Sequence, residues 1–196
     1  MMLIGVTGKA RAGKSTVARY LAAEHKFHEG SFAKRLKSVV AVKFNLTPEE
    51  TNEANKEKMI ERWGMSFRQM LQLEGTEGGW QLYDPHLSPG PSLWVRHLQV
   101  AWDYIKSEPE EFNGLVIQDV RFPHEAKWIK EQGGILLKVI RPEAKGDVGI
   151  SGHASEAHEL EADIEIENDY KIPDLYSRVE TLYQKLLDEQ AVRDLI

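Results

Sequence analysis

The stretch Gly8-Lys9-Ala10-Arg11-Ala12-Gly13-Lys14-Ser15 fits the pattern G-x-x-x-x-G-K-[ST] of a phosphate-binding loop. The apolar run Met2-Leu3-Ile4-Gly5-Val6-Thr7 precedes it directly and is typical of a buried parallel strand. After the loop, apolar residues recur at helical spacing from Val17 to Ala22, so we expect a helix to begin near Ser15 or Thr16. Strand, glycine loop and helix therefore follow in the order that the motif requires, and the stretch predicts an α/β fold that binds a nucleoside triphosphate.

The residue types within this loop suit the binding of phosphate groups. Gly8 and Gly13 let the backbone bend and approach an anion without an intervening Cβ atom. Backbone N–H groups of the loop and of the helix N-terminus then point at the phosphates. We expect Lys14 to reach the β- and γ-phosphates and the Ser15 hydroxyl to bind Mg²⁺. A chance match in a turn rich in glycine and lysine is the alternative, and the flanking strand and helix argue against it.

The composition is that of an ordinary globular protein that acts on small molecules. The chain has 196 residues, 41% hydrophobic and 29% charged, which suits one α/β domain over residues 1–196. Its net charge of −6 argues against a surface for duplex nucleic acid. The absence of cysteine excludes disulfides and thiolate metal sites, and it fits a cytoplasmic protein. Neither a membrane-spanning run nor a signal peptide is predicted.

Segments typical of strands alternate with segments typical of helices along the chain. This alternation predicts a three-layer α/β/α fold, in which two layers of helices cover a five-stranded parallel sheet. The charged residues 49–62 predict a solvated helix or a mobile arm, and residues 78–92, rich in glycine and proline, predict a loop. Beyond the first strand, the predicted strands are 27–32, 115–117, 135–140 and 164–166, and the predicted helices after the first are 36–44, 67–74, 93–106, 123–132 and 173–186.

Polar groups follow three of the predicted strands at the point where each strand ends. The phosphate loop follows the first strand, Asp119 and Arg121 follow residues 115–117, and Arg141 follows residues 135–140. Ligands of open parallel sheets bind at the carboxyl ends of the strands. Sequence order alone therefore brings the phosphate loop, one acid and two arginines to one rim. Residues 45–112 contain predicted helices but no convincing strand, and we expect them to form a cap over this rim.

Each polar residue of this rim also has a purely structural interpretation. Asp119 is expected to hold Mg²⁺ or its water shell, and Arg121 to bind a phosphate, but a salt bridge at a strand end is the alternative. Arg141 precedes a lid-like loop over residues 142–157, and it is either a cation over the donor phosphates or a helix-capping or surface arginine. The position of these residues at the ligand rim favours the functional interpretation.

Two further groups of residues permit a functional and a structural interpretation. His153, Glu156 and His158 are not expected to form a metal site, because an acidic stretch with histidines is usually solvated and no additional ligand is evident. A polar site and an ordinary amphipathic helix are equally compatible with the side chains near one helix end, namely Arg68, Gln72, Glu74 and Thr76.

Several blocks occur in an order that resembles the bacteriophage deoxynucleoside monophosphate kinases, a branch of the phosphate-loop (P-loop) kinases. Each block is short and weak alone, whereas the ordered set is fairly specific and covers most of the chain outside residues 45–60 and 78–92. The blocks are Gly8 to Thr16, Ser31 to Lys37, Arg68 to Thr76, Asp119-Val120-Arg121-Phe122 with Glu125, Val139-Ile140-Arg141-Pro142, His153 to Glu156, and Ile164 to Asn168.

The resemblance implies a reaction in which ATP, with Mg²⁺, donates its γ-phosphoryl group to a deoxynucleoside 5′-monophosphate. It implies catalytic roles for Lys14, Asp119, Arg121 and Arg141 and a place for Asp119 near the metal, whereas metal binding by Ser15 rests on the general phosphate-loop rule, because some relatives have Asp-Thr where this chain has Ser15-Thr16. The residues implied to hold ATP are Gly8, Ala10, Arg11, Ala12, Gly13, Lys14, Ser15, Thr16, Arg141 and Asn168. The residues implied to hold the acceptor are Phe32, Lys34, Arg68, Gln72, Glu74, Thr76, Asp119 and Arg121.

Two other functions stay open at this point. A P-loop kinase with a different acceptor, such as dephospho-coenzyme A or phosphomevalonate, would share the fold and the loop. A nucleotide-dependent switch is the second alternative, although Asn168-Asp169-Tyr170-Lys171 does not fit the guanine motif of a GTPase. The resemblance also allows a homodimer, and it implies action in the host cytoplasm if the gene belongs to a phage.

Overall fold

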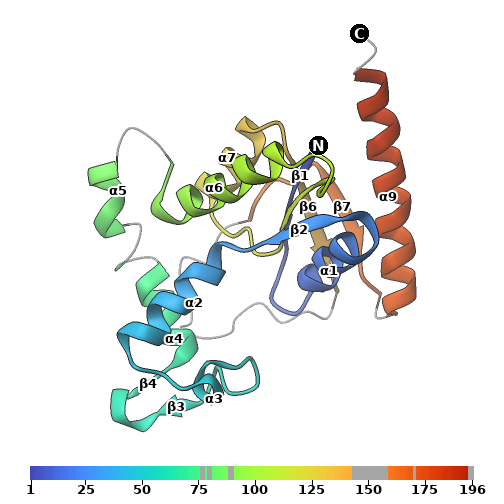
Figure 1. The fold of residues 1–196 in the computed structure, drawn as a ribbon. Helices are drawn as coiled ribbons and strands as arrows, with labels where there is room; N and C mark the ends of the chain where they lie inside the picture. The colour runs from blue at the N-terminus through green and yellow to red at the C-terminus, as the bar shows by residue number, and fades with distance from the viewer. Residues whose placement is uncertain (76–77, 79–80, 88–90, 143–158, 170, 194–196) are drawn as a thin grey trace.

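A computed structural model describes residues 1–75, 78, 81–87, 91–142, 159–169 and 171–193. At its centre lies a five-stranded sheet in the order β2-β5-β1-β6-β7, and every neighbouring pair of strands is parallel (Figure 1). The predicted five-stranded parallel sheet is thus confirmed. The strands are β1 (Met2–Thr7), β2 (Phe27–Gly30), β5 (Gly114–Ile117), β6 (Ile135–Ile140) and β7 (Ile164–Glu167).

The central strand β1 pairs with β5 on one side and with β6 on the other. Leu3 is in register with Leu115 of β5, and Val6 with Leu137 of β6. The chain moves from β1 outward to β2, returns to β5, and then crosses over β1 to reach β6. The carboxyl end of β1 is therefore the point at which the strand order reverses, where open parallel sheets bind their ligands.

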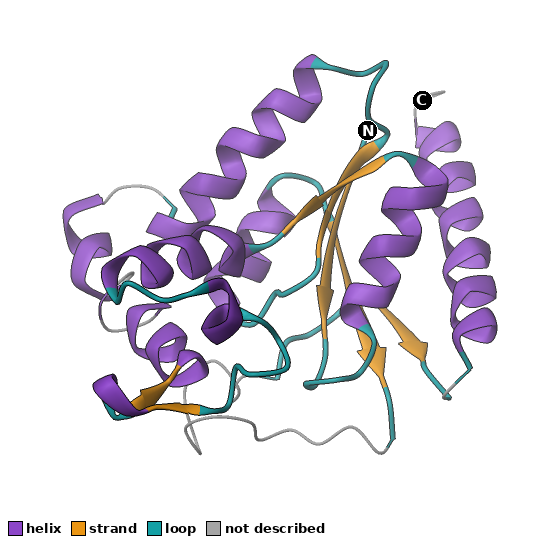
Figure 2. Cartoon of the chain, turned by 60° about the horizontal axis from the view of Figure 1, so that its bottom comes forward, coloured by secondary structure: helices purple, strands orange, loops and turns teal. Residues whose placement is uncertain are grey.

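Helices cover both faces of the sheet, which confirms the three-layer fold (Figure 2). On one face, α1 (Lys14–His25) and α9 (Ile172–Arg193) bury apolar residues such as Val17 and Leu175 against the strands. On the other face, α6 (Leu93–Ser107) and α7 (Pro123–Glu131) contribute residues such as Leu98 and Ile129. None of the described helices combines the length and the apolar character that a membrane span requires.

A small lobe, residues 32–75, lies beside the sheet and has an apolar cluster of its own. Val40, Ile60, Phe67 and Met70 are all buried in this cluster. Leu36 packs against both this cluster and the one that includes α6 and α7. The elements of the small lobe are α2 (Phe32–Lys43), α3 (Pro48–Thr51), β3 (Met59–Ile60), a 3₁₀-helix (Glu61–Trp63), β4 (Met65–Ser66) and α4 (Phe67–Gly75).

The structure differs from the sequence expectation mainly within residues 45–112. Helix α6 packs on the sheet rather than in a cap, because its stripe of large apolar residues is buried against β2 and β5. The antiparallel pair β3–β4 was not predicted, since strands of two residues are too short to show alternation. Helix α5 (Gln81–Leu87) occupies part of the expected loop 78–92, and it contacts α6 despite containing Pro85. The expected lid-like loop, residues 142–157, lies outside the described residues except for Pro142.

Candidate active site

The phosphate loop connects β1 to α1 in a conformation that requires glycine at both ends. Gly8 has φ 134° and Gly13 has φ 110°, values that other residues rarely adopt. A Cβ atom on Gly8 would lie 2.4 Å from the Val139 carbonyl oxygen, and one on Gly13 would lie 2.6 Å from Asn168 Nδ2. Neighbouring strands therefore leave no room for a side chain, and the loop is held close against β6 and the residue after β7.

Hydrogen bonds hold the loop in a concave shape. Lys14 Nζ donates to the carbonyl oxygens of Gly8 (2.7 Å) and Lys9 (2.8 Å). The side-chain amide of the buried Asn168 donates to the carbonyl oxygen of Ala12 at 2.7 Å. At the start of α1, the N–H groups of Thr16 and Val17 donate to the Gly13 carbonyl oxygen (3.0 and 3.1 Å). The positive end of the helix dipole, which lies at this start, suits a polyphosphate.

A polar pocket opens at this loop and forms the candidate donor site. The structure brings the predicted Arg141 and Asn168 to it, and Arg141 Nη1 donates to the Arg11 carbonyl oxygen at 3.4 Å. Two apolar residues at the start of α9 were missed by the sequence analysis, because they look like an ordinary helix stripe. The pocket is lined by Arg11, Gly13, Lys14, Ser15, Thr16, Arg141, Asn168, Ile172 and Leu175.

Three predicted nucleotide-binding residues do not line the donor pocket but belong to its loop. Ala12 is buried, and its carbonyl oxygen accepts the Asn168 bond, whereas the Gly8 carbonyl oxygen accepts from Lys14. Ala10 lies between them without lining the pocket. Backbone atoms of Gly8 and Ala12 thus shape the loop rather than presenting side chains to a ligand.

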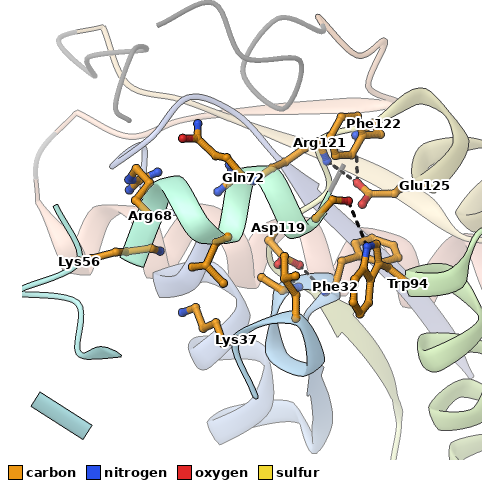
Figure 3. Close-up of a pocket in the computed structure, with 14 residues that line it drawn as sticks. Phe32, Lys37, Lys56, Arg68, Gln72, Trp94, Asp119, Arg121, Phe122 and Glu125 are labelled. Atoms are coloured by element: carbon orange, nitrogen blue, oxygen red, sulfur yellow. Dashed lines mark hydrogen bonds between the residues drawn. The ribbon is translucent and has the colours of Figure 1, made fainter. Parts of the chain in front are cut away.

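A second pocket lies between the small lobe and the rim of the sheet (Figure 3). Four cationic side chains line it: Lys37 of α2, Lys56, Arg68 of α4, and Arg121 after β5. In Figure 3, Lys37, Lys56 and Arg68 lie on one side of the pocket, and Trp94, Phe122 and Glu125 lie on the other. The full lining is Phe32, Ala33, Leu36, Lys37, Lys56, Arg68, Leu71, Gln72, Gly75, Trp94, Asp119, Arg121, Phe122 and Glu125.

The cationic side of this pocket is a strong site for an anion. Burial and the neighbouring charges of Lys37, Arg68 and Arg121 together lower the pKa of Lys56 to about 8, against the opposing effect of Glu53. A lysine that gives up its proton so readily marks a concentration of positive charge. Phosphate is the ligand that such a group of cations suits best.

Two carboxylates of the small lobe pair with these cations. Glu53 lies 2.7 Å from Lys37 Nζ and 3.4 Å from Lys56 Nζ. Glu57 forms an ion pair with the Arg68 guanidinium. These carboxylates are largely exposed, with side-chain exposures of 70% for Glu53 and 45% for Glu57. A phosphate bound in this pocket would compete with these carboxylates for the same cations.

Asp119 joins the sheet to the small lobe. Its carboxylate accepts hydrogen bonds from the Ser31 hydroxyl (2.8 Å) and from the backbone N–H groups of Phe32 and Ala33 (both 2.9 Å). It thus caps α2 from outside that helix, since Ser31 at the N-cap position makes no such bond itself. No group of three or more acidic or histidine side chains that would hold a metal ion occurs among the described residues.

Glu125 is an unusual carboxyl group at the aromatic side of the pocket. Its side chain caps α7 by accepting hydrogen bonds from the N–H groups of Arg121 (2.7 Å) and Phe122 (2.9 Å). Burial, with a smaller effect of Asp119, raises the pKa of Glu125 to about 8, although the two backbone hydrogen bonds and Arg121 act in the opposite direction. The carboxyl group is therefore mostly neutral at pH 7.

The structure brings most of the predicted acceptor residues together. Phe32, Arg68, Gln72, Asp119 and Arg121 all line the second pocket, and their binding of the acceptor stays a prediction. The metal role of Asp119 stays a prediction.

Three other predicted acceptor residues do not line this pocket or cannot be placed. Lys34 is exposed and does not line it, because α2 presents Lys37, one turn later, instead. Glu74 pairs with Lys43 at 2.5 Å and does not line it either. Thr76, like His153, Glu156 and His158, lies outside the described residues.

The sequence analysis did not assign the other lining residues to this pocket, among them the charged Lys37, Lys56 and Glu125 and the aromatic Trp94. Glu125 had a signal, because it closes the Asp119–Phe122 block and stands three residues after a potential N-cap. Lys56 had none, because it lies in a charged stretch that looks fully solvated.

Comparison with known proteins matches this geometry. An Acanthamoeba polyphaga mimivirus protein named a deoxynucleotide monophosphate kinase is 35% identical over 189 residues, which cover 91% of this chain and 94% of that protein. The chain belongs to the deoxynucleotide monophosphate kinase family. A second member, the deoxynucleoside-5′-monophosphate kinase of Escherichia phage T5, is 32% identical over 117 residues, 57% of this chain and 42% of the phage protein. No protein-family model matches the sequence.

A solved structure supports the fold of this family member. The dephospho-CoA kinase from Campylobacter jejuni superposes with a TM-score of 0.51 and covers 96% of this chain and 98% of its own. The two sequences are 13% identical, so the likeness concerns the fold alone. It confirms that the parallel sheet and its flanking helices have the fold of that kinase.

Proposed function

We propose that this protein transfers the γ-phosphoryl group of ATP to a deoxynucleoside 5′-monophosphate, giving ADP and the deoxynucleoside diphosphate. The observation that carries the proposal is the pocket with four cations, Lys37, Lys56, Arg68 and Arg121, beside a phosphate loop. Two adjacent anion sites suit a reaction between two phosphate groups. Membership of the deoxynucleotide monophosphate kinase family supports a deoxynucleotide as the acceptor.

The residues of the donor pocket would bind the triphosphate. Lys14 leaves its two loop carbonyl oxygens and contacts the terminal phosphates, while the first-turn N–H groups of α1 hold the remaining oxygens. Arg141 lies at the pocket, where it would neutralise charge on the transferred group. The base would pack against Ile172 and Leu175, whose apolar surface faces the same pocket.

The oxygen donors at this site fit a hard divalent cation. The Ser15 hydroxyl lines the donor pocket at the start of α1, and Asp119 is the carboxylate after the neighbouring strand β5. Both Asp119 oxygens already accept hydrogen bonds from the start of α2, so Asp119 would hold Mg²⁺ through coordinated water rather than directly. When bound, Mg²⁺ neutralises charge on the β- and γ-phosphates.

The acceptor needs no general base, because its phosphate is already ionised at neutral pH. The chain's contribution is to position this phosphate and to neutralise its charge. Arg68 and Arg121 offer planar guanidinium groups that can bind phosphate oxygens in pairs, and Lys37 and Lys56 add point charges. A homodimer and action in the cytoplasm of a host cell stay predictions.

The test is ADP release with Mg-ATP against a panel of acceptors at pH 7. The panel contains the four deoxynucleoside monophosphates, their ribose counterparts, dephospho-coenzyme A and phosphomevalonate. We expect turnover on one or more deoxynucleotides, and loss of that turnover in Lys14→Ala but not in Lys9→Ala, whose exposed side chain leaves the loop backbone unchanged. Turnover only on a non-nucleotide acceptor, or on none, would overturn the proposal.

A further inference from the structure

One oxygen of Glu125 is open to the second pocket, which we call the acceptor pocket from here on. The residue is only 4% exposed and lines the pocket from the start of α7 (Figure 3). Oε2 is held by the N–H groups of Arg121 and Phe122. In the part of the chain that the structure describes, no residue forms a hydrogen bond with Oε1. A buried carboxyl group with an open oxygen is costly unless a ligand completes it.

The surroundings of Glu125 suit a planar, uncharged ligand. Trp94, Phe122 and Phe32 line the same pocket, and Trp94 is fixed because its indole N–H donates to the Gly75 carbonyl oxygen at 3.1 Å. Aromatic side chains of this kind pack against the flat face of a nucleobase. The acceptor's phosphate belongs instead with Lys37, Lys56 and Arg68, which lie on the other side of the pocket in Figure 3.

We propose that Glu125 is a specificity-determining residue of the acceptor pocket, whose Oε1 donates a hydrogen bond to an acceptor atom on the nucleobase. This inference rests on the proposed function, because it assigns the part of that substrate that Glu125 binds. The Glu125 proton belongs on Oε1, since Oε2 already accepts two N–H groups. A base carbonyl oxygen or an unprotonated ring nitrogen is the matching group, and the bases differ in where they present these groups.

The charge state of Glu125 makes the proposal testable by pH. Its pKa of about 8 means that the donor is present at pH 7 and mostly lost at pH 9. The charged groups around Glu125 are Asp119 at the end of β5 and Arg121 before α7, with Lys37, Lys56 and Arg68 from the small lobe lining the same pocket. Because Lys56 also titrates near pH 8, the pH profile of the wild-type protein alone would not isolate Glu125.

Dividing the activity of a Glu125 variant by that of the wild type at the same pH removes the effect of Lys56 titration, because both proteins contain Lys56. In Glu125→Gln, the amide oxygen accepts the two N–H bonds and the amide nitrogen donates where Oε1–H does, at every pH. We expect kcat/KM for the preferred deoxynucleotide, at saturating Mg-ATP, to match the wild type within about twofold at pH 7. At pH 9 we expect the variant to exceed the wild type about tenfold, because one pH unit above the pKa leaves about a tenth of the carboxyl protonated.

A second variant separates base recognition from a structural role in α7. Glu125→Ala should lower kcat/KM unequally among the four deoxynucleoside monophosphates, by about tenfold for the preferred one, while KM for ATP stays unchanged. Glu131→Gln, at the exposed end of the same helix, is the control and should change neither quantity.

Three outcomes overturn the inference. If the ratio of kcat/KM for Glu125→Gln to kcat/KM for the wild type is the same at pH 7 and pH 9, Glu125 does not act as a protonated hydrogen-bond donor. If Glu125→Ala lowers kcat/KM equally for all four deoxynucleotides, Glu125 acts only as a cap of α7. Failure of the wild-type protein to turn over any of the four would overturn the proposed function as well, and this outcome is distinguishable because it appears before any variant is compared.

Discussion

Lys56 bears a large electrostatic cost in the acceptor pocket. It is 13% exposed and is surrounded by Lys37, Arg68 and Arg121, so its charged form is disfavoured. Glu53 compensates for only part of this cost. A phosphate in the pocket would supply the missing negative charge, which makes Lys56 a residue kept for binding at the expense of stability.

Replacing Lys56 should therefore separate binding from stability. In Lys56→Met we expect KM for the deoxynucleotide to rise about tenfold at pH 7, with little change in KM for ATP, because one cation of the acceptor site is lost. The pKa of Lys56 is lowered to about 8, so the folded protein releases this proton more readily than the unfolded chain does. The contribution of Lys56 to the free energy of unfolding of the wild type should accordingly increase between pH 8 and about pH 10. Lys56→Met should lack this increase.

Urea unfolding at pH 7 and pH 9.5, together with steady-state kinetics, measures both parts of this prediction. Lys58→Met, an exposed lysine two residues later, is the matched control. An unchanged KM for the deoxynucleotide would show that Lys56 does not contact the acceptor.

Individual residues were predictable where a short motif fixes them. The phosphate loop, Arg68, Gln72, Asp119 and Arg121 were found because they stand in ordered blocks at strand or helix ends. Lys56 and Glu125 were not, because their chemistry comes from burial by segments far away in the chain. Local sequence reports the identity of a titratable group but not the neighbours that set its pKa.

At the scale of the element, α2 depends on a carboxylate that it does not contain. Asp119, at the end of β5, takes the place of a side-chain cap at the helix N-terminus. The same helix carries Lys37 into the acceptor pocket. The position of that cation is thereby fixed relative to the rim of the sheet.

Removing this cap should affect both stability and acceptor binding. We expect Asp119→Ala to lower the free energy of unfolding by about 1–2 kcal/mol, the usual cost of losing an N-cap. KM for the deoxynucleotide should rise as well, since α2 no longer holds Lys37 in place. Urea unfolding and steady-state kinetics measure these two effects, and Asp174→Ala, in the first turn of α9, serves as a control outside the acceptor pocket.

Asp119→Asn tests the predicted metal role of the same residue. Its amide oxygen retains part of the cap, so a large loss of kcat at unchanged stability would point to Mg²⁺ rather than to α2. Unchanged stability in Asp119→Ala would contradict the capping role.

Elements were predictable in proportion to their length and periodicity. Helix α6 and strands β5 and β6 show clear patterns and were expected close to their observed bounds, and α9 was expected at its start but continues seven residues beyond its expected end at residue 186. The pair β3–β4 and the short helix α5 were missed, because a few residues cannot establish a period and contacts with α6 stabilise α5.

At the scale of the whole molecule, Glu125 links stability to pH. Its pKa is raised from 4.5 to about 8, so the folded protein keeps a proton that the unfolded chain loses. Its contribution to stability is fully present below pH 4.5 and is lost progressively as the pH rises through about 8. We expect wild-type stability to fall over this range relative to Glu125→Gln, which cannot ionise.

Thermal unfolding of the two proteins at pH 5, 7 and 9 measures this difference. The gap in midpoint temperature should widen in favour of Glu125→Gln as the pH rises, whereas Glu131→Gln should follow the wild type. A gap that is the same at all three pH values would show that Glu125 is already ionised in the folded protein at pH 5.

The overall architecture was predictable because strand–loop–helix order and the phosphate loop together leave few topologies. The extent of the small lobe was not predictable, because the sequence does not show that α6 packs its stripe of apolar residues on the sheet. Which layer an amphipathic helix joins depends on the partner surface, and that surface exists only in three dimensions.

Helix α2 begins in one apolar cluster and ends in another, with Phe32 beside the sheet and Val40 inside the small lobe. Asp119 holds its start, and packing against α6 and α4 holds the rest. A helix of 12 residues is about 18 Å long, so a tilt of about 10° at its start would move its far end by about 3 Å. Because α2 joins the sheet to the small lobe, we expect a slight rotation at the sheet to move the lobe, with its lysines and Arg68, relative to the phosphate loop.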